Sequence, residues 1–404
     1  MTPAQPQSVR RRRVFYIPGY DPFHPRRYRE LYRRQGALQA EISGFRLALS
    51  PGRGGRSWTV ISTQDNTETR TEFKVLAWSD IDRASMGGTI PATYAQMVHT
   101  AWIYLSTGAL FRLMQLRKGP ILVALYPVVV LLLQAAAALG LGWLGMRAAA
   151  AALPGAPSAA WLAPGLGAAA AVALLQLFRH NDRWFFAYYL MHDYAFSSRW
   201  RGAYPPELDR RIAEFGSRIE AALTEDWDEV LVVGHSSGAH LAVSLLARLI
   251  RDGRANGPAA LGLLTLGQAM PMISFLPEAR ALRADLALMA GQSRAFWLDV
   301  SAPGDGCAFA LCDPAAVSGV APPHARGPLI LSAAFSKTIA PERWRKLRRH
   351  VFRLHFQYLC AFEHPGSYDY SRITAGPLRL ADRFAGQAPS RSRITRVASR
   401  HTAR

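Results

Sequence analysis

Five residues near the middle of the chain have the types and spacing of a serine nucleophile. Gly234-His235-Ser236-Ser237-Gly238 follows an apolar, β-branched run that predicts a strand, and it precedes a helical run, Leu241–Ile250. The two glycines let a strand and a helix pack against a tight turn, where a Cβ atom would clash. Such a turn exposes the serine hydroxyl at the edge of a sheet, above the amino end of the helix. The motif predicts that Ser236 attacks a carbonyl carbon and that the N–H of Ser237 stabilises the oxyanion.

A serine hydroxyl is a weak nucleophile, so this motif needs a histidine base and a carboxylate that orients the base. Asp305 lies in a loop after the expected strand 295–300, whereas Asp299 lies inside that strand. Catalytic side chains of open α/β sheets gather in the loops beyond the carboxyl ends of the strands. Asp305 is therefore the predicted acid, and Asp299 is the alternative.

The same criterion selects the base among the histidines that follow the acid. Residues 351–359 alternate as a last strand would; His355 lies inside this strand and His364 lies in the loop beyond it. His364 is therefore the predicted base. His355 stays open as the alternative, since a histidine inside a strand is often a buried core residue.

A second oxyanion donor is expected near the start of the chain. Residues 14–17 predict a short buried strand, which runs directly into Pro18-Gly19-Tyr20. A turn at this position aims the next backbone N–H at a site above the sheet. Alone it would be an ordinary Pro-Gly turn, but together with the serine motif it predicts that Tyr20 donates its N–H to the oxyanion.

Strands that alternate with helices predict a mostly parallel sheet flanked by helices, with the site at the carboxyl ends of the strands. The first part of this domain is expected at 14–78 and the second part at 206–385. The flanking residues 1–13 and 386–404 are rich in arginine and are expected to be disordered.

The intervening residues, 79–205, contain a strongly apolar segment. Between Gly119 and Phe178 the only charged residue is Arg147. The stretches 120–146 and 158–178 are each long enough to cross a bilayer, for which about 20 apolar residues suffice. Joined by a short turn, they predict a transmembrane hairpin. A buried helical pair in a soluble cap domain is the alternative.

The charges around this hairpin predict its orientation. The chain carries a formal net charge of +20. Basic residues flank both ends of the hairpin, whereas the turn carries Arg147 alone, so the positive-inside rule places the globular domain in the cytoplasm, at the inner membrane. No nucleic-acid-binding signature accompanies the charge, and a lipid bilayer is the expected partner. The chain has three cysteines, Cys307, Cys312 and Cys360. They lack metal-ligand spacing, which argues against a metal site.

These motifs together resemble the α/β-hydrolase superfamily, on its lipase and esterase side. The resemblance covers about 14–78 and 205–380, and it implies a Ser-His-Asp triad that uses no metal or organic cofactor. The chain has Pro-Gly where members of the superfamily usually have His-Gly before the first oxyanion donor. Because its first clear strand already carries that turn, the sheet is expected to lack the first two strands of the superfamily.

We therefore expect a membrane-anchored serine hydrolase that acts on a carboxylic ester. A lipid-like or acyl ester is the expected substrate, because hydrophobic esters partition into the bilayer beside the site. Acyl transfer to an acceptor other than water would use the same residues. A non-catalytic binding module that keeps the hydrolase fold is the alternative from a different class.

Overall fold

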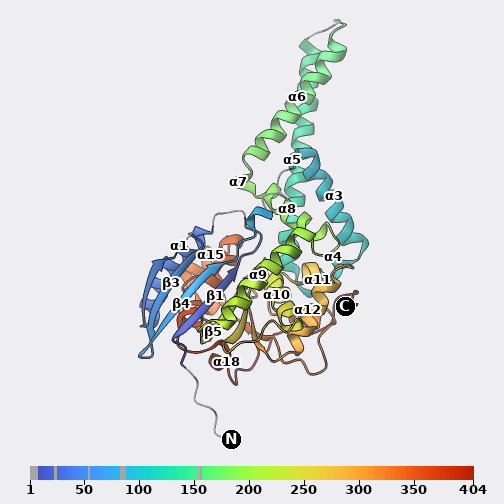
Figure 1. The fold of residues 1–404 in the computed structure, drawn as a ribbon. Coiled ribbons are helices and arrows are strands. Elements are labelled where there is room, and N and C mark those ends of the chain that lie inside the picture. Colours follow the sequence, from blue (N-terminus) through green and yellow to red (C-terminus); the bar gives the residue numbers. More distant parts are fainter. Residues whose placement is uncertain (1–7, 22–24, 53–54, 82–87, 153, 155–156) are drawn as a thin grey trace.

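The computed structural model describes the chain apart from residues 1–7, 22–24, 53–54, 82–87, 153 and 155–156 (Figure 1). Its centre is an eight-stranded sheet with the order β2-β3-β4-β1-β5-β6-β7-β8. From β4 to β8 all neighbours pair in parallel, whereas β3 pairs antiparallel with both β2 and β4. The expected α/β class with a mostly parallel sheet is thus confirmed. The strands are β1 Arg11–Ile17, β2 Arg46–Pro51, β3 Ser57–Gln64, β4 Thr67–Val75, β5 Glu229–His235, β6 Ala260–Leu266, β7 Ala295–Ser301 and β8 Leu329–Ser332.

Helices cover both faces of the sheet, which is why β5 is buried along its whole length. On one face Val232 packs with side chains of α9, α10 and α12. On the other face its neighbour Val233 packs with side chains of α1, α17 and the carboxyl-terminal segments. The helices outside the apolar segment are α1 Arg26–Ser43, α9 Pro206–Thr224, α10 Gly238–Arg251, α11 Pro271–Ser274, α12 Arg280–Gly291, α13 Pro314–Val317, α14 Phe335–Thr338, α15 Pro341–Leu347, α16 Val351–His355, η2 Phe356–Leu359, α17 Tyr370–Ala375 and α18 Leu380–Arg383.

Arg11, Arg12 and Arg13 belong to the sheet, although disorder was expected for residues 1–13. Residues 1–7 of that range lie outside the described residues. β1 begins at Arg11, and the side chain of Arg12 is fully buried. Its Nε atom donates to Glu229 Oε2 at 2.6 Å, and its terminal nitrogens donate to the carbonyls of Gly376 and Leu378. A buried guanidinium is stable when its donors are paired in this way. The prediction missed these partners because they lie far away in the sequence.

The basic tail is also packed against the domain, where disorder was expected for 386–404. Ile394 forms a parallel β-bridge with Cys312, and the N–H of Ala398 donates to the carbonyl of Val317 at 2.9 Å. The side chain of Arg404 donates to the carbonyl of Val320 at 2.9 Å. Backbone pairing therefore holds this segment in place despite its charge.

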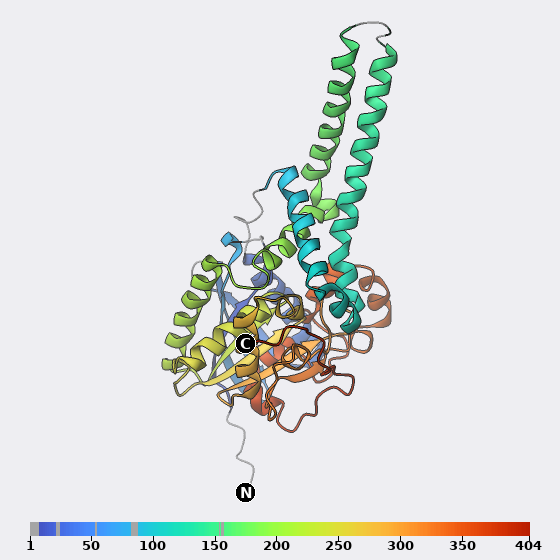
Figure 2. The same ribbon diagram turned by 90° about the vertical axis from the view of Figure 1, so that its right-hand side faces the viewer.

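Two long helices project together from the domain (Figures 1 and 2). Each is long and apolar enough to cross a membrane. Their backbones approach closely where an ideal Cβ on Gly167 would lie only 2.5 Å from the carbonyl oxygen of Gly142. Large apolar side chains point outward, such as Leu139 at 72% exposed and Trp161 at 84% exposed. The helices of the whole segment are α3 Ile90–Ser106, α4 Ala109–Leu116, α5 Lys118–Ala152, α6 Ala159–His180, α7 Asp182–Phe185 and α8 Ala187–Ser198.

Candidate active site

Ser236 occupies a strained turn between β5 and α10. Its φ angle is 57°, in the left-handed region that costs a non-glycine residue about 1–3 kcal/mol. Its N–H donates to the carbonyl of Leu266 at 2.9 Å, which ties the turn to the end of β6. An ideal Cβ on Gly234 would lie 2.7 Å from Ala239 Cα, and one on Gly238 would lie 2.3 Å from the carbonyl oxygen of Ile17. Both glycines are therefore required by close packing, and Ser236 itself stays partly exposed.

The turn after β1 lies directly against this serine. An ideal Cβ on Gly19 would lie 2.9 Å from Ser236 Cβ. The N–H of Tyr20 donates to Ser237 Oγ at 2.8 Å, so the side chain of Ser237 bridges the two turns. The N–H of Ser237 lies at the amino end of α10, where helix geometry supplies no acceptor. Both predicted oxyanion donors thus lie beside the serine.

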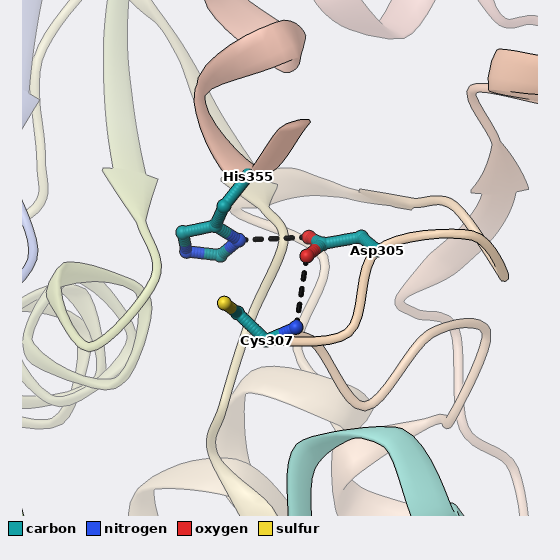
Figure 3. A group of neighbouring side chains, drawn as sticks. All are labelled: Asp305, Cys307 and His355. Carbon is teal, nitrogen blue, oxygen red and sulfur yellow. Dashed lines mark hydrogen bonds and ion pairs between the residues drawn. The ribbon is translucent and has the colours of Figure 1, made fainter. Parts of the chain in front are cut away.

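Asp305 lies in the loop after β7, and its side chain is buried. Its Oδ2 atom accepts a hydrogen bond from His355 Nδ1 at 2.7 Å, and its Oδ1 atom accepts one from the N–H of Cys307 at 2.9 Å (Figure 3). Oδ2 also accepts a hydrogen bond from the hydroxyl of Tyr358 at 2.9 Å. Burial by itself would raise the pKa of Asp305. The charge of His355 and these hydrogen bonds outweigh burial and lower the pKa below its usual value. The carboxylate is therefore ionised and fully paired.

His355 connects this acid to the serine turn. It ends α16, and its ring centroid lies 4.7 Å from that of His235, the residue before Ser236. His235 Nε2 also lies 3.0 Å from the carbonyl oxygen of His355. Because Nδ1 bonds to Asp305, Nε2 is the nitrogen that stays available, and it is buried with no hydrogen-bond partner among the described residues. With Nδ1 held by Asp305, Nε2 is the atom that carries the lone pair a general base needs.

The structure pairs Asp305 with His355, not with the predicted base His364. His364 is exposed, and its backbone N–H donates to the carbonyl of Thr338 at 3.0 Å. The strand expected at 351–359 was wrong, because this segment forms α16 and η2. In a helix Leu354 and Tyr358 share one buried face, and the adjacent His355 projects toward Asp305.

The alternative acid, Asp299, lies inside the sheet and bonds to a neighbouring strand. It is fully buried inside β7 and accepts a hydrogen bond from Thr265 Oγ1 at 2.6 Å. Burial raises the pKa of Asp299 to about 7. Its interactions are with the sheet, and its carboxyl group is not bonded to a histidine among the residues that the structure describes.

Sequence reasoning missed several residues that complete the site. Tyr358 follows His355 by three positions. A helix predicted for 351–359, in place of a strand, would have put the two residues on neighbouring turns of one face. The N–H of Cys307 bonds to the side chain two residues earlier, a common arrangement of aspartate in turns. The hydroxyl of Tyr189, in α8, donates to the carbonyl of Tyr20. No local pattern predicts this last contact, because the two residues are 169 positions apart in the sequence.

Asp305, Cys307 and His355 could also be considered as metal ligands, since their ligand atoms lie within 4.8 Å of one another (Figure 3). Both carboxylate oxygens of Asp305 already accept hydrogen bonds. Burial, reinforced by the charge of Asp305, raises the pKa of the Cys307 thiol well above its usual value. A neutral thiol is a poor metal ligand. The donor set therefore fits a histidine–aspartate pair better than a metal site.

No protein-family model, curated protein or solved structure matches this chain.

Proposed function

We propose that this protein is a membrane-anchored serine hydrolase of the α/β-hydrolase type, which acts on a carboxylic ester through Ser236, His355 and Asp305. The observation that carries this proposal is the buried Asp305–His355 pair, whose histidine ring packs on His235, the residue before a serine at φ 57°. The chain order Ser, Asp, His and the strand–turn–helix context also match that superfamily. His355 takes the role that the sequence had suggested for His364, because only a histidine bonded to the acid is held in one tautomer.

The geometry supports a two-step acyl mechanism. His355 Nε2 takes the proton of the Ser236 hydroxyl while Oγ attacks the carbonyl carbon, and Asp305 stabilises the resulting imidazolium. The same nitrogen then returns the proton to the alkoxide that leaves. Water repeats the sequence on the acyl-enzyme and releases the acid, with His355 again as base.

The oxyanion formed in each step would be held by the N–H groups of Ser237 and Tyr20. The first projects from the amino end of α10, where the helix dipole favours negative charge. The second now donates to Ser237 Oγ, and it reaches the oxyanion when that hydroxyl rotates away. The side chain of Ser237 would thus keep the Tyr20 donor paired until the substrate arrives.

The hairpin supports a position at the membrane. The outward apolar side chains of α5 and α6 would be costly in water, and a buried cap pair would not leave them exposed. The basic flanks and the sparsely charged turn favour a cytoplasmic catalytic domain at the inner membrane. We infer that the substrate is a lipid-like or acyl ester, which reaches the site from the bilayer.

A fluorophosphonate probe, which reacts with activated serines, tests the catalytic proposal. Purified full-length protein should be labelled, and Ser236→Ala should abolish the label. Labelling no stronger than that of Ser236→Ala would leave only a binding function for this fold. Product analysis with and without an added alcohol separates hydrolysis from acyl transfer. A reporter fused into the turn at 148–157 tests the orientation, and a cytoplasmic signal there would overturn it.

A further inference from the structure

A second surface with its own chemistry lies where the hairpin meets the domain. The segment from α15 to α16 carries exposed basic side chains on a short length of chain. Within this exposed set, only Arg345 has an acidic partner in the described part of the chain, Glu342 at 3.7 Å. The others have no carboxylate within ion-pair distance in the described part of the chain. The basic set consists of Arg345, Lys346, Arg348, Arg349 and Arg353.

Exposed aromatic side chains adjoin these cations. Phe352 precedes Arg353 in α16, and its ring centroid lies 6.1 Å from that of Phe186. Each of these two rings is 39% exposed, and Trp184 is 73% exposed. Large apolar side chains that gather on a surface mark a contact with a partner or a membrane.

Both groups are continuous with the foot of the hairpin. The hydroxyl of Tyr126, in α5, donates to the carbonyl of Phe185 at 2.8 Å. An ideal Cβ on Gly306 would lie 3.4 Å from Val123, in α5, and 3.6 Å from Val351, at the start of α16. Figure 1 shows α7 and α8 at this foot. The aromatic residues and the start of α16 therefore lie beside the end of the hairpin that is nearest the domain.

We propose that this collar, defined by the basic set together with Trp184, Phe185, Phe186 and Phe352, binds the anionic phospholipids of the membrane surface. Aromatic rings favour the headgroup level, and unpaired arginines attract phosphate groups. Nucleic acid would explain the charge but not the apolar hairpin beside it. The inference rests on the proposed membrane anchoring. Since His355 ends α16, lipid contact along this helix holds the catalytic base at the bilayer surface.

Hydrogen exchange of the full-length chain in lipid nanodiscs tests this binding. The nanodiscs contain phosphatidylcholine alone or a mixture with anionic phosphatidylglycerol. Peptides from 341–359 should exchange more slowly in the anionic discs. The difference should disappear at about 1 M salt, where the Debye length falls to roughly 3 Å. Each basic residue near an anionic surface contributes about fivefold to binding, so a double charge reversal should abolish the difference.

The variants are Arg349→Glu/Arg353→Glu and a matched control, Arg218→Glu/Arg326→Glu. The control arginines are exposed and lie in the half of α9 that leads into β5 and just before β8. They therefore sit toward the amino ends of the strands, away from the hairpin. Arg349→Gln/Arg353→Gln, which changes half as much charge, should lose less protection than the reversal.

The proposal requires that the control keeps the lipid-dependent protection while the collar variant loses it. Equal exchange in both kinds of disc, or the same loss in the control, overturns it. A full-length chain that does not enter nanodiscs overturns both the anchoring and the collar. Fluorophosphonate labelling of Ser236 is scored separately in detergent, so failure of the lipid proposal is distinguishable from failure of the catalytic one.

Discussion

The identity of the catalytic base is the prediction that the structure makes most sharply. His355→Gln keeps a polar side chain beside Asp305, but it removes the nitrogen that can accept the proton of Ser236. Loss of a triad base lowers kcat by about 10⁴–10⁶ in serine hydrolases. At 1.36 kcal/mol for each factor of ten, this equals roughly 5–8 kcal/mol of transition-state stabilisation. We expect a loss of this size for His355→Gln.

The matched variant is His364→Gln. Its side chain is exposed, and exposed substitutions change the free energy of unfolding by about 0.5 kcal/mol or less, so both the fold and the activity should be retained. The assay is hydrolysis of p-nitrophenyl esters by the purified protein, with the rate of fluorophosphonate labelling as a second readout. Thermal unfolding of both variants shows whether each is still folded, so that a loss of activity can be assigned to the missing base. A large loss in His364→Gln together with an active His355→Gln would refute the assignment.

Three further substitutions test other parts of the structure. Asp305→Asn replaces an acceptor of three hydrogen bonds and favours the wrong histidine tautomer, so kcat for ester hydrolysis should fall by about 10⁴ without loss of the fold. The folded-state pKa of Asp299, about 7, lies above its unfolded value, so its contribution to stability is present below about pH 4 and is lost as the pH rises through 7. Asp299→Asn should therefore reduce the loss of stability between about pH 5 and pH 8, to which Asp299 contributes up to about 3 kcal/mol, and this should be seen as a smaller fall in Tm; an unchanged fall would contradict this. Gly238→Ala puts a methyl group 2.3 Å from the carbonyl oxygen of Ile17 and should abolish Ser236 labelling, whereas Gly140→Ala meets open space and should not.

The serine turn and the acid could be placed from sequence because both depend on short-range rules. Gly234 and Gly238 are required within two residues of Ser236, and Asp305 follows a strongly apolar strand. The base could not be placed in the same way. Short apolar segments such as 351–359 fit a strand or a helix equally well by periodicity. The helix is settled by tertiary contacts, above all the bond from Tyr358 to the carboxylate of Asp305.

The basic termini show a second limit of local patterns. A run of arginines usually predicts a solvated segment. Here the partner of Arg12 is Glu229, more than two hundred residues away, and the carbonyls of Gly376 and Leu378 complete its hydrogen bonds. Only the assembled sheet brings these acceptors together. Charge composition therefore predicted exposure for an arginine that the assembled sheet buries.

The place of the apolar segment in the chain explains why the two long apolar helices and the candidate site lie at the same edge of the sheet. The segment leaves after β4, at the carboxyl ends of the parallel strands, where the turn after β1 and the Ser236 turn also lie. Its last helix contacts the first of these turns through Tyr189 and Tyr20, and α5 packs against Gly306, beside the acid. An insertion at the amino ends of the strands would place the hairpin on the opposite edge. The connection after β4 thus places the two apolar helices beside the site. Under the proposed anchoring, the same topology brings the collar and the bilayer surface to His355, at the end of α16.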